Sequence, residues 1–140
     1  MAKVVITGKI PAIAVERLRA EHEVVSWDEP VAISRDELLK RVKGADAIVS
    51  LLTEKVDAEL LDAAGSQLKV VSNVAVGYNN IDVPACKERN VLVTNTPGVL
   101  TEATADIAMA LILMSTRRLA EGERVIRKQE PWQWGMFYML

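Results

Sequence analysis

One segment of this 140-residue chain combines residue types that could bind an anion. The run from Asn73 to Asp82 follows a β-branched stretch and contains Gly77, with Asp82 placed to begin a helix. A glycine in such a turn lets backbone N–H groups approach an anion closely, outside the carboxyl end of a strand. A tight loop capped by Asp82 explains the same residues without a ligand. Local chemistry alone favours that purely structural interpretation.

The other reactive residues predict neither an acid–base pair nor a metal site. The single histidine, His22, lies among charged residues, which indicates a solvated loop side chain rather than a catalyst. The single cysteine, Cys86, falls within a predicted helix and is interpreted as a packed thiol. One cysteine and one histidine cannot form a structural zinc site. No two of the seven glycines stand two residues apart, so no G-x-G-x-x-G loop is present for a pyrophosphate.

Composition and charge limit the partners and the compartment. The formal net charge is −2, and a phosphate-binding surface usually needs a basic excess, so we expect no nucleic-acid partner. One cysteine excludes an intramolecular disulfide, which indicates a reducing, cytoplasmic setting. The apolar start before Gly8 is too short for a secretory signal, and the apolar stretch 107–114 is too short to span a bilayer. We therefore expect no membrane partner.

The elements that must position these residues are short β-branched runs alternating with helical patterns. Three helices have predicted N-caps: Ser34 with Glu37 as a capping box, Asp57, and Asp82 with Pro84 in the first turn. Strands separated by such helices imply an α/β, flavodoxin-like, doubly wound five-stranded parallel sheet. The predicted strands are 3–7, 23–27, 47–52, 68–72 and 91–94, and the predicted helices are 11–20, 34–42, 57–64 and 82–89.

The pattern changes after Pro97 and Gly98. A long helix is predicted over 101–120, followed by a helical stretch over 121–128, and apolar residues cover most of the circumference of the first. Such a helix should be buried on more than one side. Residues 132–140 form an aromatic C-terminal arm that is too apolar for a free terminus. The helix and the arm are therefore expected to need a partner.

Four segments occur in an order that indicates one family. They are Val76–Asp82 (VGYNNID), Leu51–Thr53 after the third strand, 93–98 (VTNTPG) and 101–111 (TEATADIAMAL). In register, they resemble the G-x-x-x-I-D segment, the substrate-facing loop, the V-x-N-x-P crossover and the following helix of D-2-hydroxyacid dehydrogenases, especially glyoxylate and hydroxypyruvate reductases. The resemblance covers essentially the whole chain. It implies the N-terminal, substrate-binding part of such an enzyme alone.

The resemblance also implies roles for individual residues. The backbone N–H groups of Val76 and Gly77 would bind the substrate carboxylate, and Leu52 would line the substrate pocket. Thr104 would lie beside the nicotinamide, from the start of the long helix. The family's glycine-rich fingerprint and its catalytic Arg, Glu and His would lie beyond residue 140. No catalytic residue is therefore expected in this chain.

A division into two parts follows from the same resemblance. Residues 1–98 would form the substrate-binding domain, whereas residues 99–140 would belong to the cofactor domain and dimer interface of a longer enzyme. Trp134, or as second choice Trp132, would reach the active site of the partner subunit. We therefore expect a homodimer that pairs through the long helix and the aromatic arm, and the alternative is a monomer in which the helix folds back onto the sheet as its fifth helix.

The implied function is reduction of a small 2-keto acid, such as glyoxylate or hydroxypyruvate, by hydride transfer. NAD or NADP would serve the full-length enzyme, and neither is expected on this chain, which should be inactive alone. Two alternatives remain open: a free-standing flavodoxin-like binding or regulatory module, and an engineered, excised domain. A phospho-acceptor module should carry an acidic cluster after the first strand, where this chain has Thr7-Gly8-Lys9.

Overall fold

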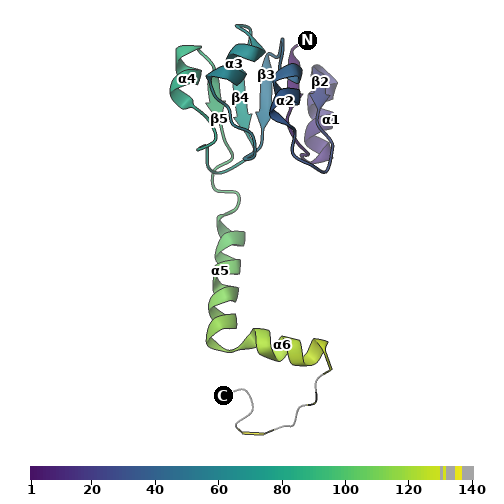
Figure 1. Ribbon diagram of the computed structural model, residues 1–140, viewed down its shortest axis with the longest axis vertical. Coiled ribbons are helices and arrows are strands. Elements are labelled where there is room, and N and C mark those ends of the chain that lie inside the picture. Colours follow the sequence, from purple (N-terminus) through teal and green to yellow (C-terminus); the bar gives the residue numbers. More distant parts are fainter. Residues whose placement is uncertain (130, 132–134, 137–140) are drawn as a thin grey trace. The chain divides into compact units, whose positions relative to one another are not determined.

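The computed structural model describes residues 1–129, 131, 135 and 136 (Figure 1). The strands are β1 Lys3–Ile6, β2 Glu23–Ser26, β3 Ala47–Ser50, β4 Val70–Asn73 and β5 Leu92–Thr94. The helices are α1 Ala12–Glu21, α2 Arg35–Arg41, α3 Ala58–Ala64, α4 Val83–Glu88, α5 Thr101–Thr116 and α6 Leu119–Arg127. The chain divides into two compact units, unit 1 (Met1–Gly98) and unit 2 (Val99–Leu140).

Unit 1 is built on one five-stranded parallel sheet in the order β2-β1-β3-β4-β5. Val4 on β1 pairs with Val24 on one side and with Ala47 on the other, and Val70 on β4 pairs with Ala47 and with Leu92. This order is that of a flavodoxin-like doubly wound fold, so the predicted sheet is confirmed. The strand order reverses between β1 and β3, and ligands of such sheets bind at the carboxyl ends beside that point.

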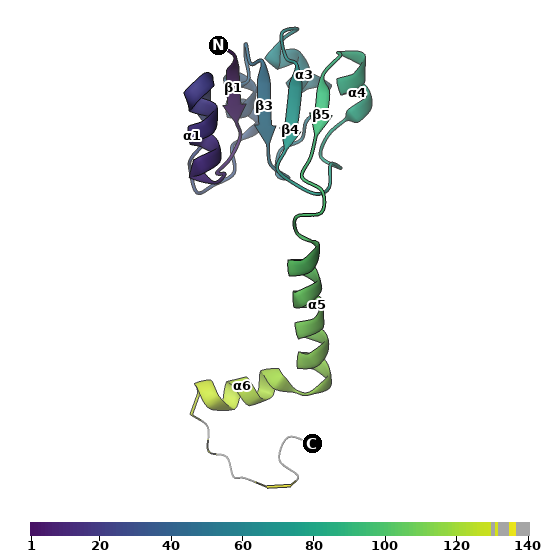
Figure 2. The ribbon, with the colours of Figure 1, turned by 180° about the vertical axis from the view of Figure 1, so that it is seen from behind.

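Helices cover the two faces of the sheet unequally. α2, α3 and α4 lie over one face, and α1 lies over the other face beside β1 (Figures 1 and 2). The first face carries the larger apolar core, in which Leu60 and Val71 are completely buried. The buried residues on the α1 side are Val4, Ile6 and Val15. The larger core packs against one face of β3 and β4. The loops that leave the carboxyl ends of these strands therefore start from a packed part of the sheet.

Three helices begin at the caps that the sequence predicts. The side chains of Ser34, Asp57 and Asp82 accept hydrogen bonds from the N–H groups of Glu37, Leu60 and Ala85, at 3.3, 3.1 and 3.0 Å. Cys86 on α4 is buried, as expected for a packed thiol. Burial, and then the negative charge of Asp82, raise the pKa of this thiol. The Asp82 cap also ends the loop after β4 at a defined point.

Unit 2 differs from the sequence prediction in its helix boundaries. The helix expected over 101–120 ends at Thr116, and the next helix begins at Leu119 rather than at residue 121. Arg118, between them, has a φ of 53°. A residue in this left-handed conformation cannot continue an α-helix, so the expected long helix breaks here.

The single chain does not itself bury the first of these helices. No residue of α5 is buried, and Ile107, Leu111 and Ile112 are 63%, 57% and 54% exposed. The other described helix of unit 2, α6, is too short to cover a helix that is apolar on most sides. Of the predicted aromatic arm, only residues 135 and 136 are among those described. No described helix has the length and apolar character needed to cross a membrane.

Candidate functional site

Buried polar residues stand at the ends of the central strands. Thr7 follows β1, Ser50 ends β3 and Asn73 ends β4, and each is at most 1% exposed. Because the strands are parallel, their carboxyl ends meet at one edge of the sheet. Two loops leave this edge: residues 51–54 form the β3 loop, and residues 74–81 form the β4 loop.

Three consecutive carbonyl groups of the β4 loop are held by hydrogen bonds. The carbonyls of Ala75, Val76 and Gly77 accept from Thr96 N–H at 2.8 Å, Asn95 Nδ2 at 2.8 Å and Asn73 Nδ2 at 2.9 Å. In a trans peptide, the next N–H points opposite to the carbonyl, and the chain has no cis peptide bond. The N–H groups of Val76, Gly77 and Tyr78 therefore point away from these partners. Within the described residues, none of the three donates a hydrogen bond.

The space beside these N–H groups is open. Val76 and Tyr78 are 43% and 53% exposed, and a Cβ placed on Gly77 would meet no atom within 4 Å. The φ angle of Gly77 lies outside the left-handed region, so the backbone conformation does not require glycine here. Successive free N–H donors beside open space are suited to a small anion such as a carboxylate.

A buried carboxylate holds the β3 loop. Glu54 is 5% exposed, and its Oε2 accepts from Thr7 Oγ1 at 2.5 Å and from the N–H of Leu51 at 2.8 Å. Its Oε1 accepts from the hydroxyl of Thr53. These bonds tie the loop to the end of β1. Leu52, the residue predicted to line the substrate pocket, remains 63% exposed within this fixed loop.

The side chain of Asn80 joins the two loops. Its Nδ2 donates to the carbonyls of Leu51 and Glu54, both at 3.0 Å. It also exchanges hydrogen bonds with the amide of Asn73, at 3.1 and 3.3 Å. The Val56 N–H adds a main-chain link by donating to the Asn80 carbonyl at 2.8 Å. The β3 and β4 loops are therefore parts of one hydrogen-bonded network.

The structure brings some of the predicted site residues together and leaves others apart. Val76–Gly77 lie on the β4 loop, which the network connects to the β3 loop and hence to Leu52. Thr104 belongs to unit 2, where it lies exposed in the first turn of α5. Trp134 and the second choice Trp132 lie outside the described residues.

The residues that hold the site are not those that the sequence pattern predicts. Glu54, Asn73 and Asn80 make the side-chain hydrogen bonds that fix both loops, yet none was singled out. Only Asn73 offered a local signal, because it is a polar residue at the end of a mainly apolar strand. Asparagine is common in turns, and Glu54 bonds to Thr7, which is 47 residues away in the chain, so composition alone did not distinguish these residues.

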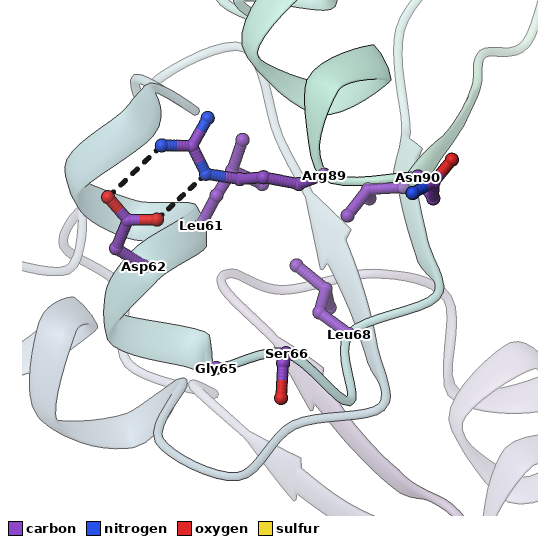
Figure 3. A pocket seen from close by; sticks show the side chains of 8 residues that line it. Leu61, Asp62, Gly65, Ser66, Leu68, Arg89 and Asn90 are labelled. Atoms are coloured by element: carbon purple, nitrogen blue, oxygen red, sulfur yellow. Dashed lines mark hydrogen bonds and ion pairs between the residues drawn. The ribbon is translucent and has the colours of Figure 1, made fainter.

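A cavity of about 420 Å³ lies at the opposite, amino edge of the sheet. Residues from α3 and from the segments before β4 and β5 line it (Figure 3). The cation in its wall, Arg89, is already paired with Asp62, through hydrogen bonds of 2.7 and 3.1 Å. These bonds raise the pKa of Arg89 and lower that of Asp62. This cavity is the weaker candidate site, because its guanidinium is already paired and because ligands of such sheets bind at the carboxyl edge.

An apolar groove of about 560 Å³ lies beside α1, between this helix and the strands β1, β3 and β4. His22 lies in its wall, half-buried, and its buried Nδ1 has no hydrogen-bond partner among the described residues. The prediction of a solvated histidine is therefore wrong, because the end of α1 places the ring in the groove. In the described ranges, no group of three or more His, Cys, Asp or Glu could hold a metal ion.

Comparison with known proteins gives a consistent result. The family model for the catalytic domain of D-isomer specific 2-hydroxyacid dehydrogenases matches residues 4–133. A glyoxylate reductase from Thermococcus onnurineus is 48% identical over 128 residues, which are 91% of this chain and 38% of that protein. The glyoxylate reductase from Pyrococcus horikoshii is 45% identical over 128 residues, which again are 91% of this chain and 38% of that protein. The chain thus spans 38% of the length of these curated relatives.

Solved structures agree with this comparison. A Thermus thermophilus protein superposes with a TM-score of 0.90 at 39% identity, covering 99% of this chain and 44% of that one. An NADPH-dependent glyoxylate/hydroxypyruvate reductase from Sinorhizobium meliloti, in complex with NADP and malonate, has a TM-score of 0.69 at 32% identity. That match covers 91% of this chain and 38% of the other.

Proposed function

This chain belongs to the D-isomer specific 2-hydroxyacid dehydrogenases, and on that premise we propose that it is the substrate-binding part of an enzyme reducing small 2-keto acids. Glyoxylate and hydroxypyruvate are the proposed substrates, because proteins named glyoxylate reductase are up to 48% identical to the chain. The proposed reaction moves a hydride from a nicotinamide to the keto carbon and a proton to the keto oxygen, which gives the 2-hydroxy acid.

The free N–H groups of the β4 loop carry this proposal. A keto-acid carboxylate would accept hydrogen bonds from the N–H groups of Val76 and Gly77, which have no other described partner. Hydrogen bonds to an ionised acceptor are stronger than those between neutral groups. Leu52 would contribute an apolar wall from the β3 loop. The role of this chain is thus to hold the carboxylate and orient the keto group, with the proton donor supplied elsewhere in the longer enzyme.

The residues of this chain suit a carboxylate better than a dinucleotide. A pyrophosphate usually needs a glycine-rich loop before a helix, and no two glycines here stand two residues apart. We assign NAD or NADP to the longer enzyme and none to these 140 residues alone. Solved neighbours include a 3-phosphoglycerate dehydrogenase with bound NAD+ and a reductase with NADP, which support this cofactor class. Thr104 is the proposed nicotinamide contact.

We further propose that two copies pair through the 101–120 segment and the 132–140 arm, with Trp134 reaching the partner's site. α5 exposes several large apolar side chains, among them Ile107, Leu111 and Ile112. Burying each such side chain contributes about 1.5–3 kcal/mol. A second copy presents the same surface, so symmetric pairing would cover both.

Two measurements on the purified 140-residue chain test the proposed function. With glyoxylate and either NADH or NADPH, the chain should show no steady turnover, since it lacks cofactor positioning and an acid catalyst. In saturation-transfer NMR, glycolate should bind with a dissociation constant on the order of millimolar, whereas neutral glycolamide should not. Equal binding of both compounds would refute an anion site. Steady turnover would refute the assignment of chemistry to other parts of the enzyme.

A further inference from the structure

Two asparagine amides meet beneath the two loops at the carboxyl edge of the sheet. Asn73 is completely buried, and its amide exchanges two hydrogen bonds with that of Asn80. Ser50 Oγ donates to Asn73 Oδ1 at 2.9 Å, while Asn73 Nδ2 donates to the Gly77 carbonyl at 2.9 Å. Reversing the Asn73 amide would set its oxygen against that carbonyl. The orientation of the Asn73 side chain is therefore fixed by its neighbours.

Each amide also holds the main chain of a loop. Asn73 turns the Gly77 carbonyl inward, which turns the next N–H, that of Tyr78, outward. Asn80 holds the carbonyls of Leu51 and Glu54 and so fixes the β3 loop. The same pair of side chains therefore sets the direction of the Tyr78 N–H, next to the two N–H groups proposed to bind the carboxylate, and the position of the loop that carries Leu52.

We propose that Asn80, acting through Asn73, is a positioning residue that holds the β3 and β4 loops in register for carboxylate binding. Asn80 does this through main-chain carbonyls and without contact to the ligand. The role in ligand binding rests on the proposed carboxylate site, whereas the coupling of the loops rests on the hydrogen bonds alone. Asn79 provides a matched control, because its side chain is exposed and makes no hydrogen bond with the described residues.

The test compares Asn80→Ala with Asn79→Ala in the full 140-residue chain, each first shown to be folded by its urea transition. Asn80→Ala should bind oxalate roughly tenfold more weakly than wild type, which corresponds to about 1.4 kcal/mol. It should also lower the ¹⁵N order parameters of both Leu52 and Gly77. Asn79→Ala should change neither quantity. A folded Asn80→Ala chain with wild-type affinity and unchanged order parameters would overturn the proposal.

A measurement on the wild-type chain covers the case in which Asn80→Ala does not fold. Oxalate should shift the side-chain NH₂ signals of Asn73 and Asn80 with the same midpoint as the Gly77 amide, and should leave the Asn79 signal in place. Static Asn73 and Asn80 signals during a titration that moves Gly77 would overturn the proposal. If oxalate moved no signal at all, the carboxylate site itself would fail, and the order parameters of a folded Asn80→Ala chain would still decide whether Asn80 couples the loops.

Discussion

Replacing Gly77 with alanine should separate ligand binding from folding. A Cβ at this position meets no atom within 4 Å, and φ lies outside the left-handed region. The native structure therefore accepts the methyl group without strain. At such positions, alanine commonly stabilises a protein by about 0.4–1 kcal/mol, because it restricts the unfolded chain. We expect the free energy of unfolding of Gly77→Ala to stay the same or to rise by this amount.

Binding should respond in the opposite direction. The methyl group would occupy the open space through which a carboxylate reaches the N–H groups of Gly77 and its neighbours. Losing one or two hydrogen bonds of about 1 kcal/mol each costs a total of about 1–2 kcal/mol. This loss corresponds to a dissociation constant for oxalate that is roughly five- to thirtyfold higher. Binding would thus fall although stability does not.

The assay pairs urea unfolding with an amide-shift titration by oxalate. Gly65→Ala is the control, because Gly65 has a φ of 104° and its added Cβ would lie 2.6 Å from Gln67 Oε1. That variant should lose about 1–3 kcal/mol of stability and keep its affinity for oxalate. A folded Gly77→Ala chain that binds oxalate as tightly as wild type would refute the inferred site. A strongly destabilised Gly77→Ala chain would refute the inference that the backbone conformation at this position does not require glycine.

Three further predictions concern stability, reactivity and association. Partial burial acts to raise the pKa of Asp57, but hydrogen bonds from Arg35 and from the Leu60 N–H, with the Arg35 charge, outweigh it and lower the pKa. Because folding lowers this pKa, the stability that Asp57 contributes is present above the pKa that Asp57 has in the unfolded chain and is lost as the pH falls below about 4. Asp57→Asn keeps an N-cap, so its urea stability should vary less between pH 5 and pH 2 than that of wild type, and parallel profiles would contradict this. Cys86 is fully buried with a raised pKa, so a thiol reagent at pH 8 should react only at the rate of unfolding, and rapid reaction of folded chain would count against the packing described. Light scattering across a dilution series should reveal a dimer at tens of micromolar, and a clean monomer would argue against pairing through α5.

Much of unit 1 follows from local signals in the sequence. The caps at Asp57 and Asp82 are set by side chains that bond to N–H groups three residues away, and such contacts depend little on the rest of the fold. β-branched runs such as Val70–Val71 predict buried strands, and their alternation with helices predicts the parallel sheet. The location of Gly77 at the carboxyl edge of the sheet was therefore predictable, because in a parallel sheet the loop after each strand leaves that edge.

The features that the sequence did not predict depend on contacts between residues far apart in the chain, or on a backbone conformation that no side chain signals. Asn80 reaches Leu51, 29 residues earlier, and no local pattern announces that contact. The break at Arg118 places an ordinary helix former in a left-handed conformation, which propensity does not predict. His22 lies at the end of a helix whose contact with the sheet sets its burial. Tertiary packing decides the first and the last of these features, whereas the break at Arg118 lies between helices that bury no residue.

The backbone of the β4 loop is the proposed holder of the substrate carboxylate. The most direct test is a ¹H–¹⁵N titration of the wild-type chain with glycolate, read at every assigned amide, and repeated with glycolamide. Saturable shifts are expected with glycolate, largest at the amides of Val76, Gly77 and Tyr78, and no shifts are expected with glycolamide. Shifts centred on the Arg89 cavity, with Gly77 unmoved, would contradict this proposal.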